Sequence, residues 1–167
     1  MKLKELLKNV EDVELTEEQE KQIKDYLGIK DSKRWKPKEN ERYYIVTTRL
    51  TVGEAFYTVN DEINAARLLV NNCFKTKKEA EFRLEQIKVY NELKNFADEN
   101  NNGICWKDEN EDKFYINYIH SDKQVLCFSA NFIQDIGQIY FSSEELAEQA
   151  IEKVGEDRIK KYLFGVE

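Results

Sequence analysis

The sequence is poor in the residues from which most catalytic and metal sites are built. Its 167 residues include only one histidine, His120, and six glycines. A single histidine excludes a pair of histidines for acid–base catalysis, and it leaves a metal without a second imidazole ligand. With so few glycines, the chain has no P-loop, no G-x-G-x-x-G and no G-x-S-x-G pattern. We therefore expect no enzyme activity, no metal and no cofactor.

Cysteine pairs and long hydrophobic runs are also lacking. The three cysteines, Cys73, Cys105 and Cys127, are odd in number, far apart and never in C-x-x-C. This spacing argues against a disulfide framework and a zinc site, and the apolar neighbours predict small buried thiols. Charged residues interrupt every apolar stretch from Met1 onward. The sequence thus predicts no signal peptide, no membrane span and a cytoplasmic location.

The charge balance bears on the partners that the protein can bind. The chain has 26 basic and 33 acidic residues, which gives a net charge of −7. Such a surface repels a phosphate backbone on average, so direct nucleic-acid binding is not expected. Hydrophobic residues make up 41% of the chain, and this fraction is sufficient for a folded core.

A long helix is the element that the sequence predicts most directly. Thr76 and Glu79 have the spacing of a capping box. Apolar residues then recur every three or four positions, at Leu84, Ile87, Tyr90, Leu93 and Ala97. This period predicts a helix over residues 77–99.

The N-terminal segment, residues 1–32, is expected to hold two short helices. Leu3, Leu6, Leu7 and Val10 form the apolar stripe of the first. Thr16 and Gln19 form a second capping box, and Gly28 is the expected end of the second helix.

Residues 33–102 predict a first module that contains a sheet and the long helix. Residues 43–50 and 56–59 are rich in aromatic and β-branched side chains, and Gly53 between them indicates a turn. These segments predict two antiparallel strands. Residues 62–70 fit either a short helix or a third strand.

Residues 103–167 repeat this plan as a second module. Residues 106–116 align without a gap on residues 35–45, and the alignment keeps the tryptophan, the lysine after it and the strand that follows. Strands are expected near 113–120, 124–130 and 136–141. A helix should then begin at Ser142 or Ser143, with Ser142 and Glu145 as the better capping box, and should end at Gly155, before a last helical turn over 158–164.

The predicted fold class is therefore α+β, with two related antiparallel-sheet-plus-helix modules in tandem after short N-terminal helices. Each module alone would bury too little surface, so the two should share a core. The residues expected inside are Tyr44, Ile45, Leu84, Ile87, Tyr115, Ile116, Ala147 and Ile151.

An acidic stretch is the first candidate binding site. Residues 98–112 contain six acids and one base, Lys107. The four acids of its second half are the partner-binding candidates: Asp108, Glu109, Glu111 and Asp112. Such a surface can occupy the basic channel of a nucleic-acid-binding protein, because complementary fields speed association. A solvated loop between the modules is the alternative interpretation.

The two tryptophans are candidates for a different site. Basic residues surround Trp35, and Trp106 occupies the equivalent position of the second module. Both rings could stack on the base of a small nucleotide. The alternative is that each tryptophan packs at the edge of a sheet.

Three segments carry a resemblance to a known group of proteins. They are Trp35-Lys36-Pro37 with Tyr43-Tyr44-Ile45, the run NCFKTKKEAE at 72–81, and the ending GEDRIKKYL at 155–163. Over about residues 33–167 the chain resembles small accessory proteins of phages and prophages of low-GC Gram-positive bacteria. The resemblance implies a phage accessory role in the cytoplasm of a host cell, and it carries over no catalytic or binding residue.

Small phage accessory proteins often bind a host protein, and some inhibit host defence. The first hypothesis is therefore a non-catalytic inhibitor that binds a host protein stoichiometrically, with a nucleic-acid-binding protein as one candidate partner. A sponge that sequesters a small nucleotide signal near Trp35 and Trp106 is a second hypothesis. A structural or assembly factor of the virion is a third.

Overall fold

The computed structural model describes residues 16–26 and 34–166. The chain divides into two compact units, residues 1–36 and residues 37–167. In the first unit the structure describes helix α2 (Glu17–Tyr26). The predicted apolar stripe of residues 3–10 and the predicted end at Gly28 lie outside the described residues.

The capping box of α2 is present as predicted. The backbone N–H of Gln19 donates to Oγ1 of Thr16 at 3.3 Å, and the backbone N–H of Thr16 donates to Oε1 of Gln19 at 3.0 Å. These reciprocal bonds satisfy two of the backbone groups that a helix start leaves unpaired.

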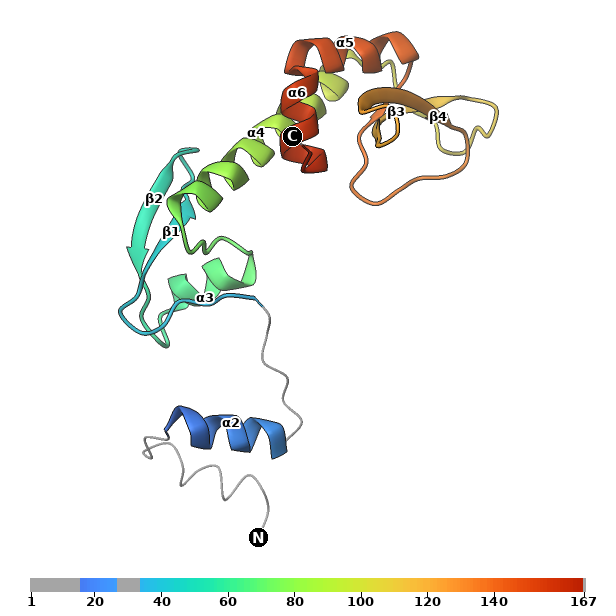
Figure 1. Cartoon of the computed structure of the whole chain (residues 1–167). Helices are drawn as coiled ribbons and strands as arrows, with labels where there is room; N and C mark the ends of the chain where they lie inside the picture. Colours follow the sequence, from blue (N-terminus) through green and yellow to red (C-terminus); the bar gives the residue numbers. More distant parts are fainter. Residues whose placement is uncertain (1–15, 27–33, 167) are drawn as a thin grey trace. The chain divides into compact units, whose positions relative to one another are not determined.

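The second unit is α+β and contains two separate antiparallel sheets (Figure 1). The strands are β1 (Arg42–Val46), β2 (Val52–Phe56), β3 (Lys113–Ile119), β4 (Gln124–Ala130) and β5 (Tyr140–Phe141). The helices are α3 (Glu62–Leu69), α4 (Lys77–Asn100), α5 (Glu144–Val154), α6 (Glu156–Ile159) and the π-helix η1 (Lys160–Phe164). Among the described residues, no helix has both the length and the apolar character that crossing a membrane requires.

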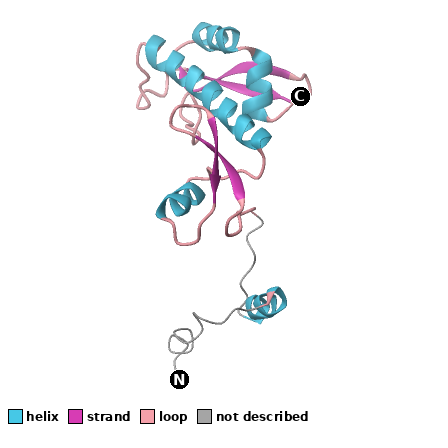
Figure 2. Cartoon of the chain, turned by 90° about the vertical axis from the view of Figure 1, so that its left-hand side faces the viewer, coloured by secondary structure: helices cyan, strands magenta, loops and turns pink. Residues whose placement is uncertain are grey.

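The first hairpin turns earlier than predicted. Figure 2 shows its two strands as one of the two magenta sheets. The turn occupies residues 47–51, where Leu50 has a positive φ of 55°. Gly53 lies within β2, opposite Ile45, and a Cβ on it would come within 3.0 Å of Thr47. The predicted strand limits at 50 and 56 were therefore wrong, because Gly53 serves close packing rather than a turn.

Residues 62–70, which fit both a helix and a strand, form helix α3. Asp61 caps its N-terminus and accepts from the backbone N–H of Asn64 at 2.8 Å. The buried side chain of Asn64 accepts from the hydroxyl of Tyr43, and Arg67 donates to the same hydroxyl at 2.9 Å. This network joins α3 to β1 and explains why Tyr43 is fully buried.

The start of α4 is joined directly to the first sheet. Phe74 forms an antiparallel bridge with Tyr44, and the side-chain amide of Asn72 pairs with both backbone groups of Val46 at 2.8 Å. The capping box of Thr76 and Glu79 is complete, as predicted. The helix therefore leaves the sheet in a fixed direction.

The end of α4 is joined in the same way to the second sheet. Asn101 follows the helix, and its side-chain amide donates to the carbonyl of Tyr140 at 2.9 Å and accepts from the N–H of Ser142 at 2.8 Å. These two bonds pair with the outer edge of β5. Figure 1 shows α4 running from the first hairpin to the C-terminal helices.

The two sheets share a strand order. In the first, β1 lies between β2 and the bridge at Phe74, and in the second, β3 lies between β4 and β5. In both, the short third pairing leads directly into a helix, α4 or α5. That the two modules are related repeats stays a prediction. The stretch between hairpin and third pairing differs, since it is helix α3 in the first module and an irregular loop in the second.

The start of α5 differs in detail from the prediction. Ser143 is its N-cap and accepts from the backbone N–H of Leu146 at 3.3 Å. The preferred box of Ser142 with Glu145 was therefore wrong, because the N–H of Ser142 donates to Asn101 and its Oγ accepts from the N–H of Asn102 at 3.3 Å. Gly155 ends the helix, as predicted, with a φ of 96° that favours glycine.

The main core lies between the second half of α4, the second sheet and the C-terminal helices. Its buried side chains are Val89, Leu93, Phe96, Ala97, Ile116, Val125, Ile139, Phe141, Ala147, Ala150, Val154 and Ile159. All eight predicted core residues are buried or half-buried. Ile45, Leu84, Ile116 and Ala147 are buried, whereas Tyr44, Ile87, Tyr115 and Ile151 are half-buried.

We expect Ile116 and Ile87 to differ in their contribution to stability. Ile116 is 7% exposed within the core, whereas Ile87 is half-buried on α4. Ile116→Ala should lower the free energy of unfolding by about 2–5 kcal/mol, because it removes buried methyl groups and leaves a space that the core fills only in part. Ile87→Ala should cost about half as much, because part of its side chain already contacts solvent. Urea unfolding of both variants measures this, and an equal or larger loss at Ile87 would contradict the assignment of the core.

An ion pair joins α4 to the C-terminal helices. Arg158 donates two hydrogen bonds to the carboxylate of Glu92, at 2.7 and 2.9 Å. This hydrogen bonding holds the pKa of Glu92 below its usual value and raises that of Arg158. A carboxyl group with a lowered folded-state pKa stabilises the fold above its unfolded-state pKa, and the stabilisation is lost as the pH falls through the folded-state value.

Arg158→Met should therefore destabilise the protein in a pH-dependent way. Both side chains are more than a third exposed, so solvent screening limits the loss at pH 7 to about 0.5–1 kcal/mol. The difference between parent and variant should shrink as the pH falls below about 4, since Glu92 becomes protonated. Urea unfolding across this range is the measurement, and a difference that stays constant with pH would contradict the role of Glu92.

Candidate functional site

The acidic stretch of the sequence is organised around a buried lysine. Lys113 is the first residue of β3 and pairs with Ala130 at the end of β4. Its side chain is 0% exposed, which is rare for lysine unless the ammonium has partners. Sequence analysis did not identify Lys113, because nothing in its neighbours distinguishes it from a solvated lysine.

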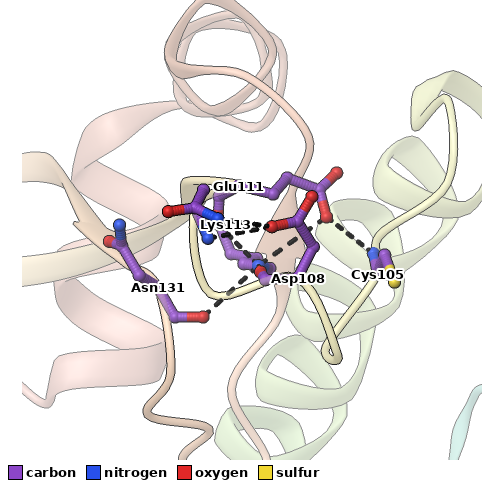
Figure 3. Close-up of polar contacts among 6 residues, drawn as sticks. Cys105, Asp108, Glu111, Lys113 and Asn131 are labelled. Atoms are coloured by element: carbon purple, nitrogen blue, oxygen red, sulfur yellow. Dashed lines mark hydrogen bonds and ion pairs between the residues drawn. The ribbon is translucent and has the colours of Figure 1, made fainter.

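Backbone carbonyls surround the ammonium of Lys113 (Figure 3). Its Nζ donates to the carbonyl oxygens of Asp108 and Glu111, and to that of Asn131 at 3.3 Å. The nearer carboxylate oxygen of Glu111 lies 3.6 Å away, and the ring of Trp106 lies 5.7 Å from Nζ. These groups replace the water that the charge loses on burial.

We define the acidic loop as residues 105–112. Glu111 ties this loop together from within, because its Oε2 also accepts from the backbone N–H of Cys105 at 2.8 Å. Asp108 accepts from the backbone N–H of Asn110 at 2.9 Å, a local turn that an aspartate or asparagine forms readily. Two of the four predicted partner-binding acids thus also shape the loop.

Three of the four acids of the loop are exposed to solvent. Asp108, Glu109 and Asp112 are exposed, whereas Glu111 is half-buried. Within the described part of the chain, neither Glu109 nor Asp112 has a hydrogen bond or ion pair. A fixed backbone therefore presents three carboxylates to solvent, which is the arrangement that attraction of a basic surface requires.

The acidic stretch is not one continuous surface feature. Asp98 and Glu99 belong to the last turn of α4, and Asp98 forms an ion pair with Lys94 on the same helix. The loop acids begin only at Asp108. We therefore restrict the candidate binding site to the acidic loop.

Trp106 serves packing within the second unit. Its ring meets that of Tyr140 edge-on, with the centroids 4.8 Å apart, and also contacts the ammonium of Lys113. Trp35, the other predicted ligand-binding residue, belongs to the first unit. A cavity of about 250 Å³ lies elsewhere, between α4, residues 137–139 and η1, and Trp106 is not among its lining residues.

The remaining chemical groups differ in exposure. His120 is exposed, and its ring meets Tyr118 edge-on at 4.9 Å. Cys73 is buried as predicted, but Cys105 is exposed, so the prediction of three buried thiols was wrong. Cys105 lies in the acidic loop, outside both sheets. Burial, with the nearby charge of Glu144, raises the pKa of Cys127 to about 11.

Comparisons with protein-family models, curated proteins and solved structures found no match. Within residues 16–26 and 34–166, no three His, Cys, Asp or Glu side chains are grouped so that they could hold a metal ion.

Lys113→Met should destabilise the second unit strongly. The methionine would fill a similar volume but would remove the donor that three carbonyls share, and the carbonyl of Asp108 would keep only the N–H of Glu111 at 3.4 Å. The expected cost is about 2–4 kcal/mol in unfolding free energy. Lys107→Met is the matched control, because Lys107 is an exposed lysine of the same loop, and it should change stability by less than about 0.5 kcal/mol. Urea unfolding measures both, and equal stability of the two variants would show that the buried ammonium does not hold the loop.

Proposed function

We propose that this protein acts by stoichiometric binding to a macromolecular partner, and that the acidic loop makes the contact. The observation that carries this proposal is the contrast between Lys113 and the acids around it. The ammonium is fully buried beneath the loop, whereas Asp108, Glu109 and Asp112 are exposed above it. A loop that is held from beneath meets a partner with little loss of conformational entropy.

The partner that we propose is a host protein with a basic surface, such as a nucleic-acid-binding protein. The net charge of −7 and the three exposed carboxylates favour association with a basic surface. The resemblance to phage and prophage accessory proteins supports a role inside a host cell. There the protein would inhibit the host protein that it binds, for example a defence protein. Binding of this kind requires no catalytic residue.

A charge-removal variant tests the proposal. Asp108→Asn, Glu109→Gln and Asp112→Asn are combined, and Glu111 is kept because it bonds to Cys105 and Lys113. The asparagine at 108 can still accept from the N–H of residue 110. Association with the partner should slow by about 3–10-fold at low salt, and its salt dependence should flatten.

The matched control removes three exposed acids on other elements, by Glu81→Gln, Glu148→Gln and Glu152→Gln. An affinity pull-down from host lysate first identifies the partner, and association rates are then measured at several salt concentrations. Equal rates and salt slopes for the loop variant and the parent would contradict the proposal. Recovery of a small nucleotide without a protein would instead support the sponge hypothesis.

A further inference from the structure

An apolar loop lies between β4 and β5. We define it as residues 131–139. Three of its large apolar side chains are exposed: Phe132 at 74%, Ile133 at 57% and Ile136 at 106%. Single exposed apolar residues are ordinary on protein surfaces, but three large ones on one short loop indicate a contact surface.

The backbone of the apolar loop is held by groups beneath it. The buried Tyr140 hydroxyl accepts from the backbone N–H of Asp135 at 2.8 Å and donates to the carbonyl of Ile133 at 3.4 Å. The side-chain amide of Gln138 donates to the carbonyl of Ile116 in β3 at 2.9 Å. The exposed side chains are therefore presented on a fixed backbone, which lowers the entropy cost of binding.

The apolar loop lies beside the acidic loop. The ammonium of Lys113 donates to the carbonyls of Asp108 and Asn131, so one buried charge holds both loops (Figure 3). Trp106 of the acidic loop also packs against Tyr140, whose hydroxyl holds the apolar loop. The two loops thus form one surface at the same end of the second sheet.

The charges of this combined surface are mostly negative. Its exposed charged residues are four acids and one base: Asp108, Glu109, Asp112, Asp135 and Lys107. Exposed apolar side chains also lie on β2 and α3, among them Phe56 and Leu69, but no described contact joins those elements to the acidic loop. The apolar loop combines exposed apolar side chains with the acidic loop beside it.

We propose that the apolar loop is the anchor of the interface, and that it inserts into an apolar pocket of a partner protein whose rim is basic. This inference rests on the proposed function and specifies its partner. Large apolar side chains at the centre of an interface carry most of the binding energy, while charges at the rim set the rate and the choice of partner. Phe132 and Ile136 would enter the pocket, and the acids would face its rim.

A synthetic peptide tests this chemistry without knowledge of the natural partner. The probe is an amphipathic helical peptide of leucine and lysine, which offers an apolar face with a basic rim. A second peptide has serine in place of every leucine. Binding to the full chain is measured by fluorescence anisotropy, and the contact is located by backbone amide chemical shifts.

Three variants of the protein are compared with the parent, and the first is the charge-removal variant of the acidic loop. Phe132→Ser with Ile136→Ser removes the anchor, and Phe56→Ser with Leu69→Ser removes a comparable aromatic and aliphatic pair elsewhere. We expect the anchor variant to bind the leucine–lysine peptide at least about tenfold more weakly, and the control variant to bind as the parent does. Shift changes should fall on both loops. Equal urea midpoints show that the variants remain folded.

The outcomes separate this inference from the proposed function. If only the charge-removal variant binds more weakly, and the serine–lysine peptide binds as tightly as the leucine–lysine peptide, then the apolar anchor is wrong and the acidic contact stands. If only the anchor variant binds more weakly, the basic rim is wrong, and so is the acidic contact. Self-association in sedimentation that the anchor variant abolishes would assign the loop to a second copy of this chain and overturn the proposal.

Discussion

The fold of the second unit depends on the attachment of α4 at both of its ends. At its start, Phe74 bridges to Tyr44 in the first sheet, and at its end, the amide of Asn101 bonds to the edge of β5 in the second. A helix is stiff, so these two attachments set the distance between the sheets. Its apolar residues serve both ends, since Leu84 is buried in the first half and Leu93 joins the main core. The first sheet has only two strands, too few to be stable without a helix to pack against.

Lys113 joins two segments of the candidate site, much as α4 joins the two sheets. A buried ammonium is costly unless it is fully satisfied, and here the carbonyls that satisfy it come from segments on both sides of the β3–β4 hairpin. The cost of burying the charge therefore couples the acidic loop to the apolar loop. Lys113 is the first residue of β3 and pairs with Ala130 of β4. The second sheet therefore fixes the position of both loops.

The parts of the structure that could be predicted from the sequence are those set by neighbours along the chain. The cap at Thr76 and the apolar period after it depend on residues within one or two turns, and α4 begins where predicted. Gly53 was misplaced because a glycine in a turn and a glycine that allows close packing look alike in sequence. The burial of Lys113 could not be predicted, because it depends on Asn131, which is distant in the chain and contributes only a carbonyl. The sequence showed that the acidic loop is charged. It did not show that Glu111 holds the loop while the other acids face solvent.

The burial of Lys113 also separates the groups that keep the loops in shape from the side chains of the proposed interface. Three of the groups around its ammonium are backbone carbonyls, and every amino acid supplies a carbonyl whatever its side chain. Glu109 and Phe132 lie next to these positions and are exposed. Substitutions there would change the surface of the proposed interface without removing a hydrogen bond that holds the loops. Loops on a rigid scaffold often vary in sequence while the scaffold is kept. In the proposed interface, a change in the partner would then require new side chains on the two loops but no new fold.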